Sequence, residues 1–288
     1  MIRTILVPTS GTSTDQSVFA SAVALARPLG AHLHCLHLRF TLYEAAARAP
    51  HVAFCRGASL SHALDYLDEQ DVALSAKAKT LFEEFCHAHA IPVRTAPSAI
   101  EEVSASWSEE TDHVEEQLLA HARYSDLTVV GRRHNVDLMP ADMTELLLLQ
   151  SGRPLVIASD KPSNGHSGTI VVGWKPTPEA THALAGATPL LQRARRVVLV
   201  NIAEADAKAA IPDALVRQLA WQGIVAEPHA LSDRTTPAAV QLPRLAGQLQ
   251  ADLLVAGAFG HSPLRESVFG GVTRALLEHA ELPVFVLH

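Results

Sequence analysis

Short apolar runs alternate with longer segments of helical periodicity along the chain. In the first half, an apolar run at residues 2–7 is followed by a loop of Thr, Ser and Gly and then by a periodic segment at residues 15–29. A second apolar run begins at Ala31, directly after Gly30. Strands that alternate with helices in this way predict parallel βαβ units.

The second half continues the same alternation to its end. Apolar runs at residues 169–174 and 197–202 flank a periodic segment at residues 178–193. The remaining predicted elements are a helix at residues 212–221, a strand at 224–231, a helix at 237–250 and a strand that ends at Gly257. The pattern predicts an α/β protein with two tandem open parallel five-stranded sheets, each covered by helices on both faces.

Two similar segments, one in each half of the sequence, each end a predicted strand on a glycine. The segment SDLTVVGRRH contains Gly131, and the segment ADLLVAGAFG contains Gly257. Each leads through a polar loop and a short apolar helix to a strand that opens on proline, Pro154 in the first copy and Pro283 in the second. A repeat of this length predicts a tandem duplication.

The boundary between the two copies is predicted at KPSNGHSG, residues 161–168, because Pro, Ser, Asn and Gly are typical of an exposed linker. We therefore predict a first domain at residues 1–160 and a second at residues 168–288. The first domain has an insertion with helix-like segments at residues 59–66 and 72–89. The latter segment has one apolar face, which predicts a covering helix.

Composition narrows the class of protein. Hydrophobic residues make up 48% of the 288 and charged residues 18%, which favours a globular chain over a disordered one. The formal net charge of −7 disfavours nucleic acid as a partner, since phosphate-backbone binding needs basic surface. The absence of an apolar run of membrane-spanning length and of a signal pattern in MIRTILVPTS predicts no membrane association and a cytoplasmic protein. The 3 cysteines fit reduced thiols.

Glycines near the end of the second domain form a candidate phosphate loop. Gly257 closes a strand, Gly260 follows, and Gly270 and Gly271 precede a helix that contains Thr273. Open α/β folds place ligands at the carboxyl ends of their strands, and glycines let the backbone approach a phosphate beside a helix N-terminus. Thr273 adds a hydroxyl donor. The alternative is that these glycines only make a tight turn.

This G-x2-G-x9-G pattern, placed before a final helix and the strand LPVFVLH, resembles the universal stress protein family. The opening IVVGWKPTPEATHAL is similar to that family's first strand, loop and helix, and the duplication is similar to its tandem members. The resemblance implies a Rossmann-like, adenine nucleotide alpha hydrolase-like fold. It also implies phosphate binding by the three glycines and a following Ser or Thr, and nucleoside binding by an acidic residue after the first strand.

The second domain departs from that family pattern at two places. Gly271 stands where the hydroxyl residue is expected, and Lys175 stands at the acidic position. One lost hydroxyl-to-phosphate bond costs roughly 1.5–3 kcal/mol, about ten- to a hundredfold in affinity. Lys175 either faces a phosphate or is a solvated loop lysine. The predicted nucleotide-binding residues are Gly257, Gly260, Gly270, Gly271, Thr273 and Lys175.

The first domain departs further. Ala141 and Asp142 align with Gly270 and Gly271 of the second domain. Ser10 occupies the position of the acidic residue after the first strand. A carboxylate at the place of a phosphate repels it. We predict no ATP site built from this loop in the first domain.

The remaining motifs give only weak evidence of a functional site. His32 and His34 share one face of a strand, with Cys35 and His37 on the other, so that either a metal site or a buried histidine-rich strand is consistent with the pattern. The basic cluster at residues 132–134 fits either an anion site or a solvated loop. The acidic run at residues 109–116 predicts a solvated helix start. No nucleophile elbow, Walker loop or HExxH helix is present, and we expect no enzymatic activity.

The leading hypothesis is a stress-response protein whose second domain binds ATP or another adenine nucleotide, with Mg²⁺ if ATP is bound, as a signalling or protective module. The alternative is an interaction or scaffold protein of the same fold without a nucleotide. A slow ATP hydrolase is the third reading. The resemblance implies pairing of the two domains, for which the exposed edges of the last strands at residues 155–158 and 284–287 are suited, and a homo-dimer is compatible with this.

Overall fold

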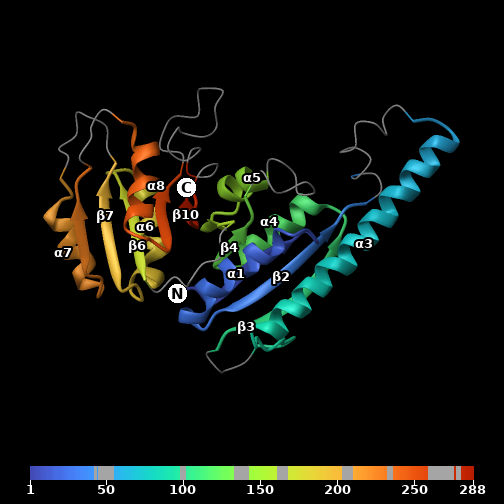
Figure 1. The fold of residues 1–288 in the computed structure, drawn as a ribbon, viewed down its shortest axis with the longest axis horizontal. Helices are drawn as coiled ribbons and strands as arrows, with labels where there is room; N and C mark the ends of the chain where they lie inside the picture. The colour runs from blue at the N-terminus through green and yellow to red at the C-terminus, as the bar shows by residue number, and fades with distance from the viewer. Residues whose placement is uncertain are drawn as a thin grey trace.

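The computed structural model describes residues 1–41, 44, 55–97, 102–132, 143–160, 168–202, 210–231, 236–258, 276 and 280–288 (Figure 1). The first half contains β1 (Thr4–Thr9), α1 (Asp15–Ala26), η1 (Arg27–Leu29), β2 (His32–Arg39), α3 (Ala58–Ala88), β3 (Ser104–Thr111), α4 (Val114–Tyr124), β4 (Leu127–Val130), α5 (Met143–Gln150) and β5 (Leu155–Ile157). The second half contains β6 (Thr169–Trp174), α6 (Pro178–Leu191), β7 (Arg196–Asn201), α7 (Asp213–Trp221), β8 (Ala226–His229), α8 (Ala238–Gln248), β9 (Leu253–Gly257) and β10 (Val284–Leu287).

All these strands belong to one ten-stranded sheet with the order β3-β2-β1-β4-β5-β10-β9-β6-β7-β8. Strands pair in parallel within each half, whereas β5 and β10 pair antiparallel, with Phe285 opposite Val156. The α/β class and the pairing expected of the last strands are confirmed. The expectation of two separate sheets is corrected, because each half leaves its last strand on an open edge and the two edges join.

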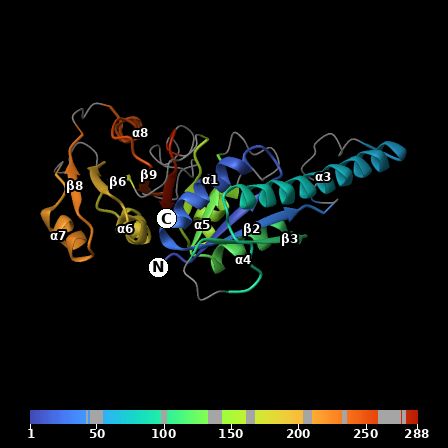
Figure 2. The same ribbon diagram turned by 60° about the horizontal axis from the view of Figure 1, so that its bottom comes forward.

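Apolar side chains fill both faces of this sheet without a break between the halves. One face packs against α1, α3, α6 and α7, and its core contains Val156 of the first half together with Phe285 and Ala187 of the second. The other face packs against α4, α5 and α8. Each layer of helices therefore covers a continuous sheet, as the two views of the molecule show (Figures 1 and 2).

An aspartate holds the same position in each copy of the repeat. The backbone N–H groups of Arg3 and Thr4 donate to Asp126 Oδ2 at 2.8 and 3.0 Å, and the N–H of Thr169 donates to Asp252 Oδ2 at 3.0 Å. In each half, the carboxylate just before the strand that pairs beside the first strand, β4 or β9, thus fixes the start of that first strand. The shared contact agrees with the predicted duplication.

The insertion of the first half differs from the expectation of two helical segments. It forms one helix, α3, of 31 residues, because LDEQD at residues 67–71 contains no helix breaker and continues the helix. One end of α3 packs against the sheet, and the other extends well beyond it (Figure 1). Within the described ranges, no helix combines the length and the apolar composition that crossing a bilayer requires.

The acidic run was wrongly expected to begin a helix over its whole length. Glu109 and Glu110 lie in β3, an edge strand that the apolar pattern did not predict. Asp112 and His113 then turn the chain with positive φ, and only Glu115 and Glu116 lie in the first turn of α4. Carboxylates at that turn are favoured by the helix dipole, so this part of the expectation is confirmed.

Candidate functional site

The carboxyl ends of β6, β9 and β10 meet the first turn of α6 in the second half. Gly257 is the last residue of β9 and pairs with Leu287 of β10. A Cβ at Gly257 would lie 2.5 Å from the backbone nitrogen of Ala180 and 2.6 Å from the carbonyl carbon of Glu179. Only glycine allows this approach of strand to helix, so that Gly257 places the end of β9 directly against the first turn of α6.

The sequence around that N-terminus explains why α6 begins there. Thr177 has extended backbone, and its Oγ1 accepts a bond from the Ala180 N–H at 3.4 Å. Pro178 occupies the first helical position, where its missing N–H costs nothing. The remaining N–H groups and the helix dipole give this turn a partial positive charge, which favours an anionic group nearby.

Glu179 is the carboxylate in that first turn. Burial favours its neutral form, but hydrogen bonds from its own N–H and from Thr177, together with the charges of His288 and Lys175, hold the pKa of Glu179 below its usual value. Its Oε2 is buried and has no hydrogen-bond partner within the part of the chain that the structure describes. The carboxylate is therefore ionised at neutral pH and retains acceptor capacity.

Two basic side chains, Lys175 and His288, lie near this carboxylate. Lys175 follows β6 directly, is half-buried, and acts on Glu179 through its charge. His288 ends the chain, with its Nδ1 3.2 Å from the carbonyl oxygen of Ala258. The structure thus brings together Gly257 and Lys175 from the predicted set and adds Thr177, Glu179 and His288. The PTPE segment, with a capping Thr, a Pro and an acid in the first turn, was the signal in the sequence that pointed to this helix start.

The other predicted ligand residues, Gly260, Gly270, Gly271 and Thr273, lie outside the described residues. Their role in phosphate binding stays a prediction.

The same edge of the first half is arranged differently. Asp15, in the first turn of α1, is only 2% exposed and accepts bonds from the Ser10 N–H, the Ser10 hydroxyl and the Gly11 N–H. Burial raises the pKa of Asp15 although these hydrogen bonds oppose the shift. Ser10 occupies the family's acidic position, and a carboxylate from the following helix lies beside it instead.

Helix α3 lies across this first-half edge. Gly11 has φ +75°, and a Cβ there would lie 2.4 Å from the carbonyl oxygen of Leu74 in α3. Arg39 of β2 donates to Asp71 of α3 at 2.7 Å, and Ser75 of α3 donates to Glu109 of β3 at 2.9 Å. Helix, loop and strands are therefore tied together over the carboxyl ends of β1, β2 and β3.

Arg132, expected in an anion site or a solvated loop, is buried and serves as a connection between the halves. It follows β4, and its Nη2 donates to the carbonyl oxygen of Leu282 at 2.8 Å. Nearby, the Ser159 hydroxyl donates to the carbonyl oxygen of Glu281 at 2.7 Å. Burial lowers the pKa of Arg132, with Asp160 opposing the shift. The solvated-loop expectation is wrong for this residue, and the rest of the cluster lies outside the described ranges.

The histidine-rich strand β2 presents two different faces, as its alternation predicted. His32 lies 2.9 Å from both Ser104 and Ser106, through Nδ1 and Nε2, and His34 Nε2 lies 2.6 Å from Ser108. On the opposite face, Cys35 and His37 lie in the core under α3, where His37 stacks on Trp107 with ring centroids 6.0 Å apart. The serines of β3 thus serve as the partners of the first two imidazoles. In the described ranges, no three His, Cys, Asp or Glu side chains are grouped to hold a metal ion.

His34 makes the stability of the fold depend on pH. Burial, with smaller contributions from the charges of His121 and His32, lowers the pKa of His34 from 6.5 to about 4. The unfolded ring takes up a proton at higher pH than the folded ring, so stability is complete above about pH 6.5 and falls as the pH drops toward 4. The full shift is worth about 3 kcal/mol, which partial solvent access reduces to about 1–2 kcal/mol.

Thermal unfolding between pH 7.5 and pH 4.5 checks this expectation. The difference in stability between wild type and His34→Gln should shrink as the pH falls. His62→Gln, on the exposed surface of α3, serves as the matched control and should follow the wild-type profile. Parallel profiles for wild type and His34→Gln would show that His34 does not titrate as expected.

Comparison with known proteins finds a sequence similarity in the second half. Residues 201–288, which include the end of β9 and the glycine pattern that follows it, match the sequence model of the universal stress protein family. This part of the chain, from β7 to the end of β10, is therefore similar in sequence to that family. The tandem organisation predicted from the sequence is consistent with the two halves of the sheet, which have the same strand order. No curated protein sequence matches this chain.

Solved structures share the fold over nearly the whole chain. A universal stress protein from Archaeoglobus fulgidus DSM 4304 is 14% identical, with a TM-score of 0.70 over 99% of this chain and 95% of that one. A candidate universal stress protein from Pseudomonas aeruginosa UCBPP-PA14 is 19% identical, with a TM-score of 0.53 over 99% and 93%. The cytoplasmic domain of a prokaryotic cation chloride cotransporter is 12% identical, with a TM-score of 0.52 over 99% and 95%. Identities this low show a common fold and leave function to the site.

Proposed function

We propose that this chain is a tandem universal stress protein, with domains at residues 1–160 and 168–288, in which the second domain binds an adenine nucleotide. The proposal makes it a cytoplasmic stress-response module that acts by binding and not by catalysis. The observation that carries it is the position of Gly257, which starts the G-x2-G-x9-G pattern inside the family match and lies against the first turn of α6.

The residues of this edge fit a nucleotide. The dipole and N–H groups of the α6 N-terminus favour phosphate, and Lys175 adds a positive charge. The unpartnered Oε2 of Glu179 is an acceptor for ribose or adenine donors, and in this proposal it replaces the acid that Lys175 displaces. If ATP is the nucleotide, Mg²⁺ would neutralise charge on its phosphates.

In the same proposal, the first domain holds no nucleotide at its carboxyl edge. Support comes from α3, whose Leu74 carbonyl packs on Gly11 and whose Asp71 and Ser75 bond to β2 and β3. The side chains that a ligand would contact there are already joined to a helix of the chain itself.

The direct experiment is to denature freshly purified protein, identify any released nucleotide by mass spectrometry, and titrate ATP calorimetrically. We expect about one ATP per chain for wild type, no binding by Gly260→Trp, and about tenfold weaker binding by Glu179→Ala. Gly247→Trp, on the exposed surface of α8, is the matched control and should bind as wild type does. Binding that survives Gly260→Trp would contradict the proposed loop.

The second candidate function is an interaction protein without a nucleotide. Gly271 and Lys175 favour it, because both replace residues that the family pattern uses for binding. No released nucleotide and no heat of binding at millimolar ATP would support this candidate and direct the search to protein partners.

A further inference from the structure

The strand edges expected to pair two copies are already used within the chain. β5 and β10 pair antiparallel with each other, so neither is open to a second copy. The outer edges of the sheet are β3 and β8. Residues 92–94 cover part of the β3 edge, where the Ala105 N–H donates to the carbonyl oxygen of Pro92 at 3.0 Å. No described segment pairs with the outer side of β8, so the β8 end of the molecule is the less covered of the two.

The backbone of β8 is a poor template for adding a further strand. β8 has only 4 residues, and Pro228 is one of them. Proline lacks the N–H of a ladder donor and is one of the devices that keep an edge strand from pairing. A partner at this end of the sheet would therefore contact the neighbouring helix, α7.

Helix α7 lies at the outer end of the second half in both views of the molecule (Figures 1 and 2). Three apolar side chains of this helix pack toward the core: Leu215, Val216 and Leu219. Asp213, Arg217 and Trp221 are exposed and follow one another at a spacing of four residues. Residues at this spacing lie on the same face of a helix, so these three form a line that points away from the sheet.

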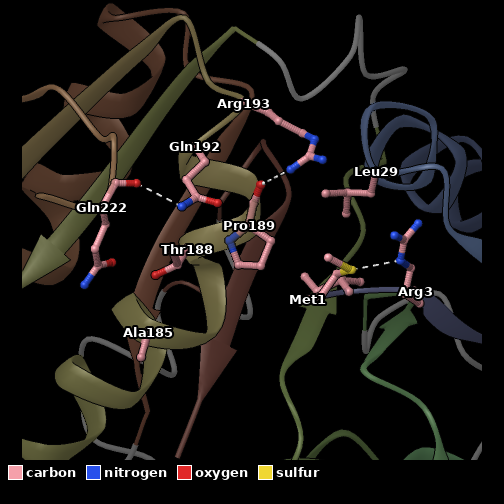
Figure 3. Close-up of a pocket in the computed structure, with 10 residues that line it drawn as sticks. Met1, Arg3, Leu29, Ala185, Thr188, Pro189, Gln192, Arg193 and Gln222 are labelled. Atoms are coloured by element: carbon pink, nitrogen blue, oxygen red, sulfur yellow. Dashed lines mark hydrogen bonds between the residues drawn. The ribbon is translucent and has the colours of Figure 1, made fainter. Parts of the chain in front are cut away.

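Trp221, at the end of that line, is 87% exposed. Tryptophan has a large apolar area and is among the side chains that supply most of the binding energy of interfaces. The helix end that carries it is held in place, because the Gln192 side chain after α6 donates to the carbonyl oxygen of Gln222 at 2.9 Å (Figure 3). The indole is thus presented on a fixed support, which lowers the entropy cost of binding.

The charges on the same line specify an orientation for a second α7 helix. Asp213 and Arg217 are both exposed, and neither forms an ion pair with another residue of the described ranges. A parallel second copy would place like charges together, which is unfavourable. An antiparallel copy brings Arg217 of each chain to Asp213 of the partner subunit. Ala214, exposed beside them, leaves room for the two helices to approach.

We propose that the outward face of α7 binds a second copy of this chain, with the two α7 helices antiparallel about a two-fold axis. Each Arg217 then pairs with Asp213 of the partner subunit, and each Trp221 lies toward the start of the partner's helix. The contact is isologous, so assembly stops at two copies. The ion pairs fix the orientation, and the two indoles supply apolar contact area.

Sedimentation velocity of the full chain, from about 1 to about 200 µM, tests whether this face associates. We expect a monomer–dimer equilibrium for wild type and a dimer dissociation constant raised about tenfold or more by Trp221→Ala. The matched control is Tyr124→Ala, because Tyr124 is also the last residue of a helix, α4, and is 79% exposed. It should dimerise as wild type does. A wild type that stays monomeric throughout, or a dimer that Trp221→Ala leaves intact, would overturn the proposal.

Exchange of the two charges tests the antiparallel orientation. Arg217→Asp and Asp213→Arg should each weaken the dimer about tenfold, because each brings like charges together across the axis. The double variant should restore the dimer, since its exchanged charges are again opposite. Arg244→Asp, on the exposed surface of α8, should have no effect. Circular dichroism and the Tm of each variant show that it is folded. A folded double variant that dimerises no better than the single variants would exclude this pairing.

Discussion

Replacing Phe285 with alanine is expected to lower the free energy of unfolding by about 3–5 kcal/mol, through one transition of the whole molecule. Phe285 is fully buried in β10, opposite Val156 of β5, at the junction of the two halves. Its ring lies in a core that contains side chains of both halves, including Val156 and Ala187. A cavity at this place therefore removes packing that both halves share.

Calorimetry and chemical denaturation check this expectation together. Wild type should unfold in one transition whose calorimetric and van't Hoff enthalpies agree, and Phe285→Ala should shift that transition as a whole. Val225→Ala is the control, because Val225 is 85% exposed and its truncation should change stability by no more than about 0.5 kcal/mol. Two separate transitions, only one of them moved by Phe285→Ala, would show that the halves unfold independently.

The apolar pattern predicted the second half well because most of its strands, β6, β7, β9 and β10, are largely buried. The strand expected at residues 169–174 is β6, and the helices expected at 178–193, 212–221 and 237–250 match α6, α7 and α8 to within about two residues. Edge strand β3 was missed because it is exposed in part and reads SASWSEET. Its pairing with β2 rests on serine-to-histidine contacts, for example Ser106 to His32, which carry no hydrophobic signal.

The residues of the candidate site were likewise predicted only in part from the sequence. Gly257 was predicted at a strand end, and it is there, because a glycine after an apolar run is a local signal. Glu179 and Asp15 were missed, since each carboxylate reaches the strand end from the first turn of the next helix, four or five residues beyond the position that the family pattern uses. The burial of Arg132 depends on Leu282, 150 residues away, and no local pattern encodes such a contact.

Replacing Gly257 with alanine is expected to destabilise the protein by roughly 2–4 kcal/mol and to weaken any nucleotide binding. The added Cβ would meet backbone atoms, the nitrogen of Ala180 at 2.5 Å and the carbonyl carbon of Glu179 at 2.6 Å. These atoms belong to the first turn of α6 and cannot rotate away as a side chain does. The strand end and the helix must separate, which also moves Lys175 and Glu179 relative to the loop that follows.

Urea unfolding of Gly257→Ala beside Gly247→Ala tests this contact. Gly247 lies in α8, where a Cβ would have no atom within 4 Å, so alanine there should stabilise the helix by about 0.5–1 kcal/mol. The same substitution should thus act in opposite directions at the two glycines. If both variants are stabilised, the close contact between β9 and α6 does not require a glycine, and Gly257 is needed only for the turn that follows β9. If Gly257→Ala is destabilised while ATP titration is unchanged, the close approach is structural and the nucleotide loop does not depend on it.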